Sequence, residues 1–436
     1  MTLTIDIETY SPTDLARSGV YKYAEHPDFC ILLFGYAVDD GEVKVVDLAK
    51  GERIPDEILQ ALTDPLVTKW AFNAAFERIC LSRYLREHCP SYFLSYGEAG
   101  ATAGKYLDPL GWKCSQVLAS SFGFPLSLKD LGNALGLSEK KMDEGSRLIG
   151  LFSLPGPMGR RLPEEFPEEW ELFKKYNARD VEVEMEVRKV FSSFHAPASL
   201  WEEYHEDQRI NDRGIPVDIP FVKAALAMGE KAGMDLLSRL KHLTGLLNPK
   251  SPCQMKAWLS ANGQKTDSLT KKETAKLLAS STGAVKEALM LYGQVQKSSL
   301  AKYGAMIDPV CDDGRTRGMF RFYGAARSGR WAGRHIQLQN LPRNSLEDLD
   351  LARTLVMEGD YEKMDFLYGS VPDTLSQLYA PPLWQGKAIP SLFPTSHPSK
   401  PESWPTWQGK NGESILLQQT RISTPSLPRE CSVSPW

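Results

Sequence analysis

The sequence of 436 residues lacks several features that would assign it to a specialised class of protein. Its seven cysteines form no CxxC pair, which argues against a structural zinc site and against a disulfide framework. The apolar run CILLFGYAV at residues 30–38 is far too short to span a bilayer, and the first ten residues lack the basic and apolar segments of a signal peptide. We therefore expect a soluble cytoplasmic protein with no membrane partner.

The sequence also lacks an excess of positive charge. A net charge of −4 excludes a protein that is basic throughout, so any contact with nucleic acid must come from a local patch. Residues 315–345 form such a patch, with seven arginines and no acidic residue. The interleaved aromatic side chains could pack the loop or stack on bases: Phe320, Phe322, Tyr323 and Trp331. From these residues alone, a solvated basic loop is the simpler interpretation.

Hydrophobic periodicity divides the chain into an α/β part, an α-rich part and a tail. β-rich runs predict strands at residues 3–7, 31–38, 43–48 and 66–72, and a DDGE turn between the second and third predicts a hairpin. Helical patterns follow at 74–88 and 165–191. Residues 199–308 lose the strand signal and predict an α-rich second domain, whereas residues 311–345 are expected to be irregular.

The long helix predicted at 165–191 combines apolar residues with a carboxylate. Spacings of three and four place six residues on one face of it: Phe173, Tyr176, Asp180, Val183, Val187 and Val190. An aspartate on an apolar face is not explained by solvation alone. Tyr176 and Asp180 lie one turn apart and should point in the same direction.

Acidic residues from separate elements are expected to converge. Asp6 and Glu8 lie two positions apart on the first strand, so their side chains point to the same face. Glu77 follows the strand at 66–72, and Asp180 lies on the long helix. Taken singly, Asp6 and Glu8 are most simply an acidic pair on an edge strand, and Glu77 is most simply a solvated carboxylate. Asp180 could be a surface residue, although its position on an apolar face argues against that. Together they would repel one another unless divalent cations neutralised them, and oxygen donors favour Mg²⁺ or Mn²⁺. Two such ions can stabilise the attacking and leaving oxygens of a phosphoryl displacement.

The order of these residues resembles the three motifs of the DEDDy 3′→5′ exonucleases. The motifs are DIE on the first strand, NxxFE after a later strand and YxxxD on the closing helix. The resemblance implies a ribonuclease-H-like fold, a mixed sheet flanked by helices, in which Asp6, Glu8 and Asp180 hold the metals. It further implies that Glu77 supports the second metal through water and that Tyr176 orients the attacking water. Many members carry Asp where this sequence has Glu77.

Three later segments resemble family A DNA polymerases, especially those of phages and prophages. Residues 204–218 resemble the entry to the polymerase region, 248–263 the thumb, and 322–343 the run that leads into the palm. The resemblance implies DNA as the partner, both as a single-stranded 3′ end and as a primer–template duplex. It implies duplex contact by residues of the basic patch: Arg330, Gln339 and Asn340, with Arg327, Arg334 and Arg343 beside them.

The palm aspartates that such a polymerase needs for nucleotide addition are missing. No Asp occurs after Asp373, and residues 379–436 hold ten of the 29 prolines and four of the ten tryptophans. In one shifted reading frame, however, the codons of 379–384 permit Arg-Thr-Ala-Phe-Val. In the same frame, those of 394–402 permit Asp-Phe-Ser-(Ser/Pro)-Ile-Glu-Ala-Arg, which resembles the first palm strand. We therefore hypothesise a frame change near residue 379; the alternative is a natural Pro/Ser-rich disordered tail.

The predicted architecture has four parts: an exonuclease domain at 1–192, a thumb and start of the palm at 193–345, a partial palm-leading segment at 346–378, and a disordered tail at 379–436. The expected protein is a monomeric 3′→5′ exodeoxyribonuclease that needs Mg²⁺ or Mn²⁺, has no small-molecule cofactor and has lost DNA synthesis. Two alternatives stay open, namely an RNA 3′ exonuclease of the ribonuclease D type and an inactive DNA-binding remnant.

Overall fold

The computed structural model describes residues 1–94, 96, 104–137, 144–157, 159–194, 196–296, 299–325, 328–341, 345–379, 407–408 and 414–415. The chain forms two compact units, Met1–Gln385 and Gly386–Trp436. In the second unit, β10 (Trp407–Gln408) pairs antiparallel with β11 (Ser414–Ile415). Four residues of the predicted disordered tail thus form a short strand pair, and most of the predicted tail lies outside the described residues.

The first part of the larger unit is built on a five-stranded mixed sheet with the order β3-β2-β1-β4-β5. Neighbouring strands β1, β2 and β3 are antiparallel, whereas β4 and β5 run parallel to β1. The predicted hairpin and the predicted strand before Glu77 are thereby confirmed, but β5 has only three residues and left no signal in the sequence. The strands are β1 (Thr2–Tyr10), β2 (Cys30–Val38), β3 (Lys44–Asp47), β4 (Thr68–Ala71) and β5 (Trp112–Cys114).

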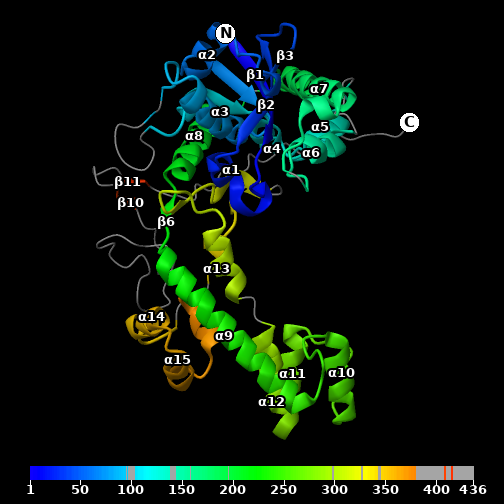
Figure 1. The fold of residues 1–436 in the computed structure, drawn as a ribbon, viewed down its shortest axis with the longest axis vertical. Coiled ribbons are helices and arrows are strands. Elements are labelled where there is room, and N and C mark those ends of the chain that lie inside the picture. The colour runs from blue at the N-terminus through cyan, green and yellow to red at the C-terminus, as the bar shows by residue number, and fades with distance from the viewer. Residues whose placement is uncertain are drawn as a thin grey trace, which may run out of the picture. The chain divides into compact units, whose positions relative to one another are not determined.

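Helices cover this sheet, and the longest of them, α7, packs against β1 and β2 (Figure 1). The predicted helix at 165–191 is confirmed, with Pro167 in its first turn. Val190 does not share the buried face as expected, since it is 37% exposed. Spacings of three and four average less than 3.6 residues per turn, so the series drifts to the edge of the buried stripe. The helices are α1 (Leu15–Glu25), α2 (Asp56–Thr63), α3 (Ala75–His88), α4 (Ser115–Ser121), α5 (Leu128–Leu135), α6 (Gly145–Phe152) and α7 (Pro167–Phe191).

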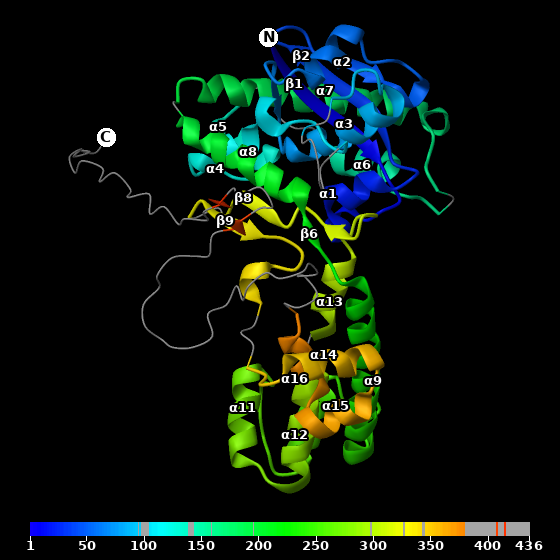
Figure 2. The same cartoon turned by 90° about the vertical axis from the view of Figure 1, so that its left-hand side faces the viewer.

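The rest of the larger unit is mainly helical, as predicted, and is organised along the 26-residue helix α9 (Ile219–Thr244). The first half of α9 shares a core with α13, α14 and α16, and its second half shares another with α10, α11 and α12 (Figure 2). The helices are α8 (Ala198–Arg213), α10 (Pro252–Ala261), α11 (Lys271–Ser280), α12 (Gly283–Val295), α13 (Ser299–Ile307), α14 (Leu349–Glu358), α15 (Tyr361–Tyr368) and α16 (Val371–Gln377).

The basic stretch contains regular structure, which corrects the expectation that 311–345 is irregular. Strands β8 (Phe320–Ala325) and β9 (Arg330–Gly333) form an antiparallel hairpin, and β7 (Arg315–Thr316) pairs with β6 (Ile215–Pro216). Alternating aromatic residues anchor the hairpin, because Phe322 packs into the core of the α/β part and Phe320 against the core of α9. Within the described residues, no helix is both long and apolar enough to cross a membrane.

Candidate active site

The carboxylates of β1 share one face of the strand. Asp6 and Glu8 alternate with Ile5 and Ile7, which are buried on the other face. The pairing of β1 with β2 shifts register between Glu8 and Thr9. A bulge of this kind changes the direction of side chains and is common beside active sites. The strand therefore presents two acidic groups side by side where its pairing becomes irregular.

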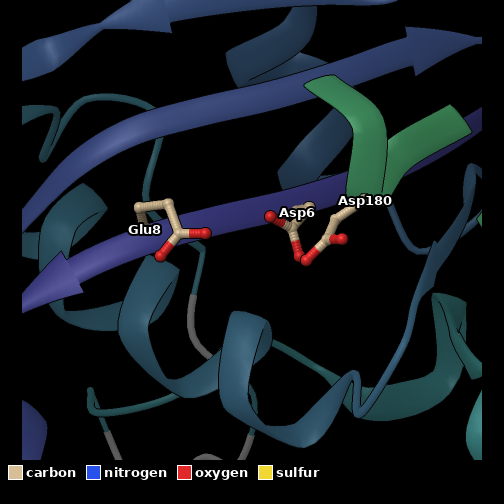
Figure 3. A group of neighbouring side chains, drawn as sticks. All are labelled: Asp6, Glu8 and Asp180. Carbon is tan, nitrogen blue, oxygen red and sulfur yellow. The ribbon is translucent and has the colours of Figure 1, made fainter. Parts of the chain in front are cut away.

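Helix α7 brings Asp180 to these two residues. Oxygen atoms of Asp6, Glu8 and Asp180, one from each carboxylate, all lie within 4.8 Å of one another. Figure 3 shows the side chains of Asp6 and Asp180 pointing toward each other, with Glu8 further along the same strand. The sequence motifs at residues 6–8 and 176–180 thus meet in space as the predicted constellation requires.

Tyr176 lies one turn before Asp180 and forms a hydrogen bond with its side chain. Burial raises the pKa of Tyr176, and the neighbouring carboxylates of Asp180, Glu8 and Asp6 raise it further. The phenol is therefore neutral at ordinary pH and keeps a proton to donate. Gly145 at the start of α6 makes room for the ring, because a Cβ at residue 145 would lie 2.3 Å from Cε2 of Tyr176.

Asn177 is a site residue that the sequence reasoning missed. It is fully buried, and its Nδ2 donates to the carboxylate of Asp6 at 2.7 Å and to the Asp6 carbonyl at 3.2 Å. Gly35 on β2 permits this approach, since a Cβ there would lie 2.5 Å from Oδ1 of Asn177. The available signal was its position, three residues before Asp180 and hence on nearly the same face of the helix.

Glu77 lies in the first turn of α3 and is only 4% exposed. Burial raises the pKa of its carboxyl well above the usual range, and the charges of Asp6, Glu184 and Glu8 raise it further. Its Oε2 has no hydrogen-bond partner among the described residues. Glu77 does not belong to the group of three carboxylates within 4.8 Å. It is a neighbour of that group, as a residue acting through water would be.

Glu184 is a second buried carboxylate that the sequence reasoning missed. It lies one turn after Asp180, is 1% exposed and accepts a hydrogen bond from Oγ of Ser115 at 2.7 Å. Burial raises the pKa of Glu184 to about 8, with Asp6 contributing in the same direction and Ser115 and Arg188 opposing it. Its spacing of four residues from Asp180 was the signal that could have pointed to it.

The donor set fits a hard divalent cation. Three carboxylates converge while Glu8 and Asp180 are largely buried, which is unfavourable without a compensating positive charge. All three ligand atoms are oxygens, the donors that Mg²⁺ and Mn²⁺ prefer over soft sulfur ligands. The residues present are therefore suitable to hold such an ion.

The arginines of the basic stretch divide into structural and exposed groups. Arg317 is fully buried, pairs with Asp313 at 2.6 Å and donates to the Asp212 carbonyl at 2.7 Å. Arg315 and Arg321 also donate to groups of the protein itself. Of the residues expected to contact duplex DNA, Arg330 and Arg334 are exposed on or beside the β8–β9 hairpin.

The remaining predicted DNA contacts follow the hairpin. Asn340 is exposed, its Nδ2 donates to the side chain of Gln337 at 2.8 Å, and its carbonyl accepts from Nζ of Lys302 at 3.0 Å. The backbone of Gln339 forms a short 3₁₀ turn with Leu338 and Asn340. Arg327 and Arg343 lie outside the described residues.

Comparison with known proteins shows that the chain is homologous to a phage DNA polymerase. The chain is 44% identical over 385 residues to a DNA polymerase of Bacillus phage SP02, a match that covers 86% of this chain and 57% of the phage protein. It thus spans little more than half the length of this relative. No protein-family model matches the chain.

Among solved structures, the chain is similar to the polymerase domain of Pol1 from M. smegmatis in complex with a DNA primer-template and dNTP. The sequence identity is 14% and the TM-score is 0.48, with 80% of this chain and 53% of the mycobacterial chain covered.

Proposed function

We propose that the chain is the N-terminal part of a phage-type family A DNA polymerase and that its retained activity is a metal-dependent 3′→5′ exonuclease acting on DNA. The observation that carries the exonuclease proposal is the convergence of the Asp6, Glu8 and Asp180 oxygens within 4.8 Å, next to the Tyr176 hydroxyl. The identity to the phage DNA polymerase supports DNA as the substrate. The five-stranded mixed sheet flanked by helices supports the proposed ribonuclease-H-like domain.

The proposed reaction is hydrolysis of the terminal phosphodiester. Asp6, Glu8 and Asp180 would hold the divalent ions, which supply charge neutralisation at the phosphate and a more acidic water. The Tyr176 hydroxyl orients that water toward phosphorus, while Asn177 fixes the carboxylate of Asp6. The water oxygen forms the new bond to phosphorus and loses a proton, and the bond to the 3′ oxygen breaks. The 3′ oxygen takes up a proton, and a deoxynucleoside 5′-monophosphate leaves.

DNA synthesis is not expected from this chain. Nucleotide addition needs a second pair of carboxylates to hold its metal ions, and the sequence has no Asp after Asp373. We propose that a frame change near residue 379 accounts for this, because one shifted frame permits both expected palm motifs in order. Sequencing the last 58 codons tests the idea, and an early stop or the absence of Asp-Phe-Ser in that frame would refute it.

The exonuclease proposal is tested on a 5′-labelled single-stranded DNA oligonucleotide with Mg²⁺. We expect Asp6→Ala to lose more than the roughly 10–100-fold typical of outer-shell substitutions, because it removes a direct ligand. Asp28→Ala, an exposed carboxylate on the loop before β2, is the matched control and should retain full activity. Activity that survives Asp6→Ala excludes Asp6 from the mechanism.

The same assay distinguishes the two alternative functions. Degradation of an RNA oligonucleotide but not of DNA would identify an RNA exonuclease. A wild-type protein that degrades neither substrate but still retards duplex DNA in a gel would be a DNA-binding remnant. Release of 5′-labelled fragments that shorten one nucleotide at a time establishes the 3′→5′ direction.

A further inference from the structure

Arg78 follows Glu77 in the first turn of α3 and is fully buried. Successive residues of a helix point about 100° apart, so Arg78 is directed away from the carboxylates that Glu77 approaches. Its Nη1 donates to the Leu107 carbonyl at 2.7 Å, and its Nη2 donates to Oδ1 of Asp212 at 2.7 Å and to Gln208 at 3.4 Å. The charge of Arg78 is thus neutralised by a residue 134 positions later in the chain.

Asp212, in the last turn of α8, is the centre of this network. Its side chain has no exposed surface. Its Oδ1 also accepts from the hydroxyl of Tyr21 at 2.5 Å, its Oδ2 accepts from the hydroxyl of Tyr96, and its carbonyl accepts from Nε of Arg317 at 2.7 Å. Asp212 therefore joins α1, α3 and the segment at residue 96 to the part of the chain that begins with α8.

The start of α3 has little local support. The N-cap residue, Ala74, offers no side-chain hydrogen bond to the first turn. Asn73 before it adopts a positive φ of 83°, which is uncommon outside glycine. A helix that starts in this way depends on tertiary contacts to hold its first turn, and the ion pair of Arg78 with Asp212 is such a contact.

We infer that Asp212 is a positioning residue for Glu77. Through Arg78, it holds the first turn of α3 and so sets the place of the Glu77 carboxylate beside Asp6. The inference rests on the proposed exonuclease function and deepens it, because it extends the site to α8. A fragment of residues 1–192 would contain every residue of the three motifs yet lack the residue that holds Glu77.

A double-mutant cycle on the full chain tests the inference. Asp212→Asn keeps one acceptor oxygen for a tyrosine hydroxyl, places an amide nitrogen beside the other hydroxyl, and removes the charge that holds Arg78. We expect it to lower kcat on single-stranded DNA by about 10–100-fold, as outer-shell substitutions do. In a protein that already carries Glu77→Gln, Asp212→Asn should not lower kcat any further, because Asp212 acts through Glu77. An equal loss in both backgrounds overturns the inference.

Mn²⁺ binding followed by electron paramagnetic resonance gives a readout that does not require catalysis. Asp212→Asn should weaken Mn²⁺ binding about 10-fold or more, and again have no effect when Glu77 is already Gln. If wild type degrades no nucleic acid, the proposed function fails, while the Mn²⁺ measurement still decides the positioning role. Unchanged Mn²⁺ binding together with a lowered melting temperature would show a purely structural role and refute the inference.

Two further variants keep the test decisive. Asp308→Asn removes an exposed ion pair between α1 and the segment after α13, and should leave kcat and Mn²⁺ binding unchanged. If Asp212→Asn fails to fold, the pair Arg78→Met with Asp212→Leu replaces the buried ions by apolar groups of similar size, an exchange that folded proteins often tolerate. That folded variant should show the same loss of activity, and retained activity would refute the inference.

Discussion

At the scale of single residues, the site depends on close contacts that only small side chains permit. Gly145 faces the ring of Tyr176, and Gly35 faces the amide of Asn177. Neither glycine has a positive φ. Their role is therefore space rather than backbone freedom, and an added methyl group would displace a side chain of the proposed site.

We expect Gly145→Ala to lower exonuclease activity. The new Cβ would lie 2.3 Å from Cε2 of Tyr176, so the ring must shift, and a displacement of about 1 Å at a reacting group can cost roughly 100-fold in rate. The control is Gly150→Ala in the same helix, where nothing lies within 4 Å of the new Cβ. Equal activities of the two variants in the single-stranded DNA assay would show that Tyr176 tolerates the shift.

Asp207 makes the stability of the protein depend on pH. Burial raises the pKa of its carboxyl to about 8, so the folded protein holds this proton over a range in which the unfolded chain, with a pKa near 3.8, has lost it. The native state is therefore penalised as pH rises from about 4 to about 8, by at most about 1.4 kcal/mol per pH unit.

Asp207→Asn should remove this penalty, because the amide can still accept from Gln208 and Asn211 and carries no charge. The free energy of unfolding of the variant, measured in urea, should rise relative to wild type between pH 5 and pH 8. Asp28→Asn on an exposed loop is the control, with no comparable change expected. A difference between Asp207→Asn and wild type that does not change with pH would contradict the expectation.

At the scale of elements, the β8–β9 hairpin and the strand before it separate two roles of arginine. Arg317 pairs with Asp313 and binds the carbonyl of Asp212 inside the protein. Arg330 starts β9 and is exposed. The same residue type therefore contributes stability before the hairpin and a solvent-facing charge within it.

Arg330→Ala should weaken duplex binding without changing stability, whereas Arg317→Ala should do the reverse. Loss of one phosphate contact should reduce the slope of the logarithm of the binding constant against the logarithm of the salt concentration by about one unit. Loss of Arg317 leaves the buried Asp212 carbonyl without its donor, whereas Asp313 keeps its ion pair with Lys105, so the free energy of unfolding should fall by about 1–3 kcal/mol. Fluorescence anisotropy over a salt series and urea unfolding measure the two effects, and equal effects of both variants would reject the division.

At the scale of the whole molecule, metal binding at the proposed acidic site would be coupled to the stability of the fold. Asp6 and Glu8 on β1 and Asp180 on α7 bring three like charges together across the first part of the chain. Any ion that binds the folded state and not the unfolded chain stabilises the fold by mass action.

Mg²⁺ or Mn²⁺ should therefore raise the melting temperature, and chelation should reverse the change. At a metal concentration 100 times the dissociation constant the gain is about 2.7 kcal/mol. In Asp180→Asn the increase should be largely lost, because one of the three ligands no longer carries a charge. Thermal unfolding with and without metal measures the difference, and an equal increase in both proteins would place the metal elsewhere.

Much of the fold and of the candidate site was predictable from local patterns. The alternation of Asp6 and Glu8 on a strand, and the one-turn spacing of Tyr176 and Asp180 on a helix, follow from the periods of these elements. Asn177 and Glu184 were missed because an amide or a carboxylate on a helix is usually solvated. Their importance appears only when β1 and α4 are packed against α7.

For β1 to β4, α3 and α7, the position of each element and the order of the acidic motifs follow from the sequence alone, because these properties depend on neighbours a few positions away. The three-residue strand β5 and the β8–β9 hairpin were not predicted in this way. Only the tertiary structure shows which arginine side chains bind groups of the protein itself. Arg317 is committed to a carbonyl 105 positions earlier and Arg78 to a carboxylate 134 positions later. An arginine can contact DNA only if no carboxylate or carbonyl from a distant part of the chain already binds its guanidinium group, and tertiary packing decides this.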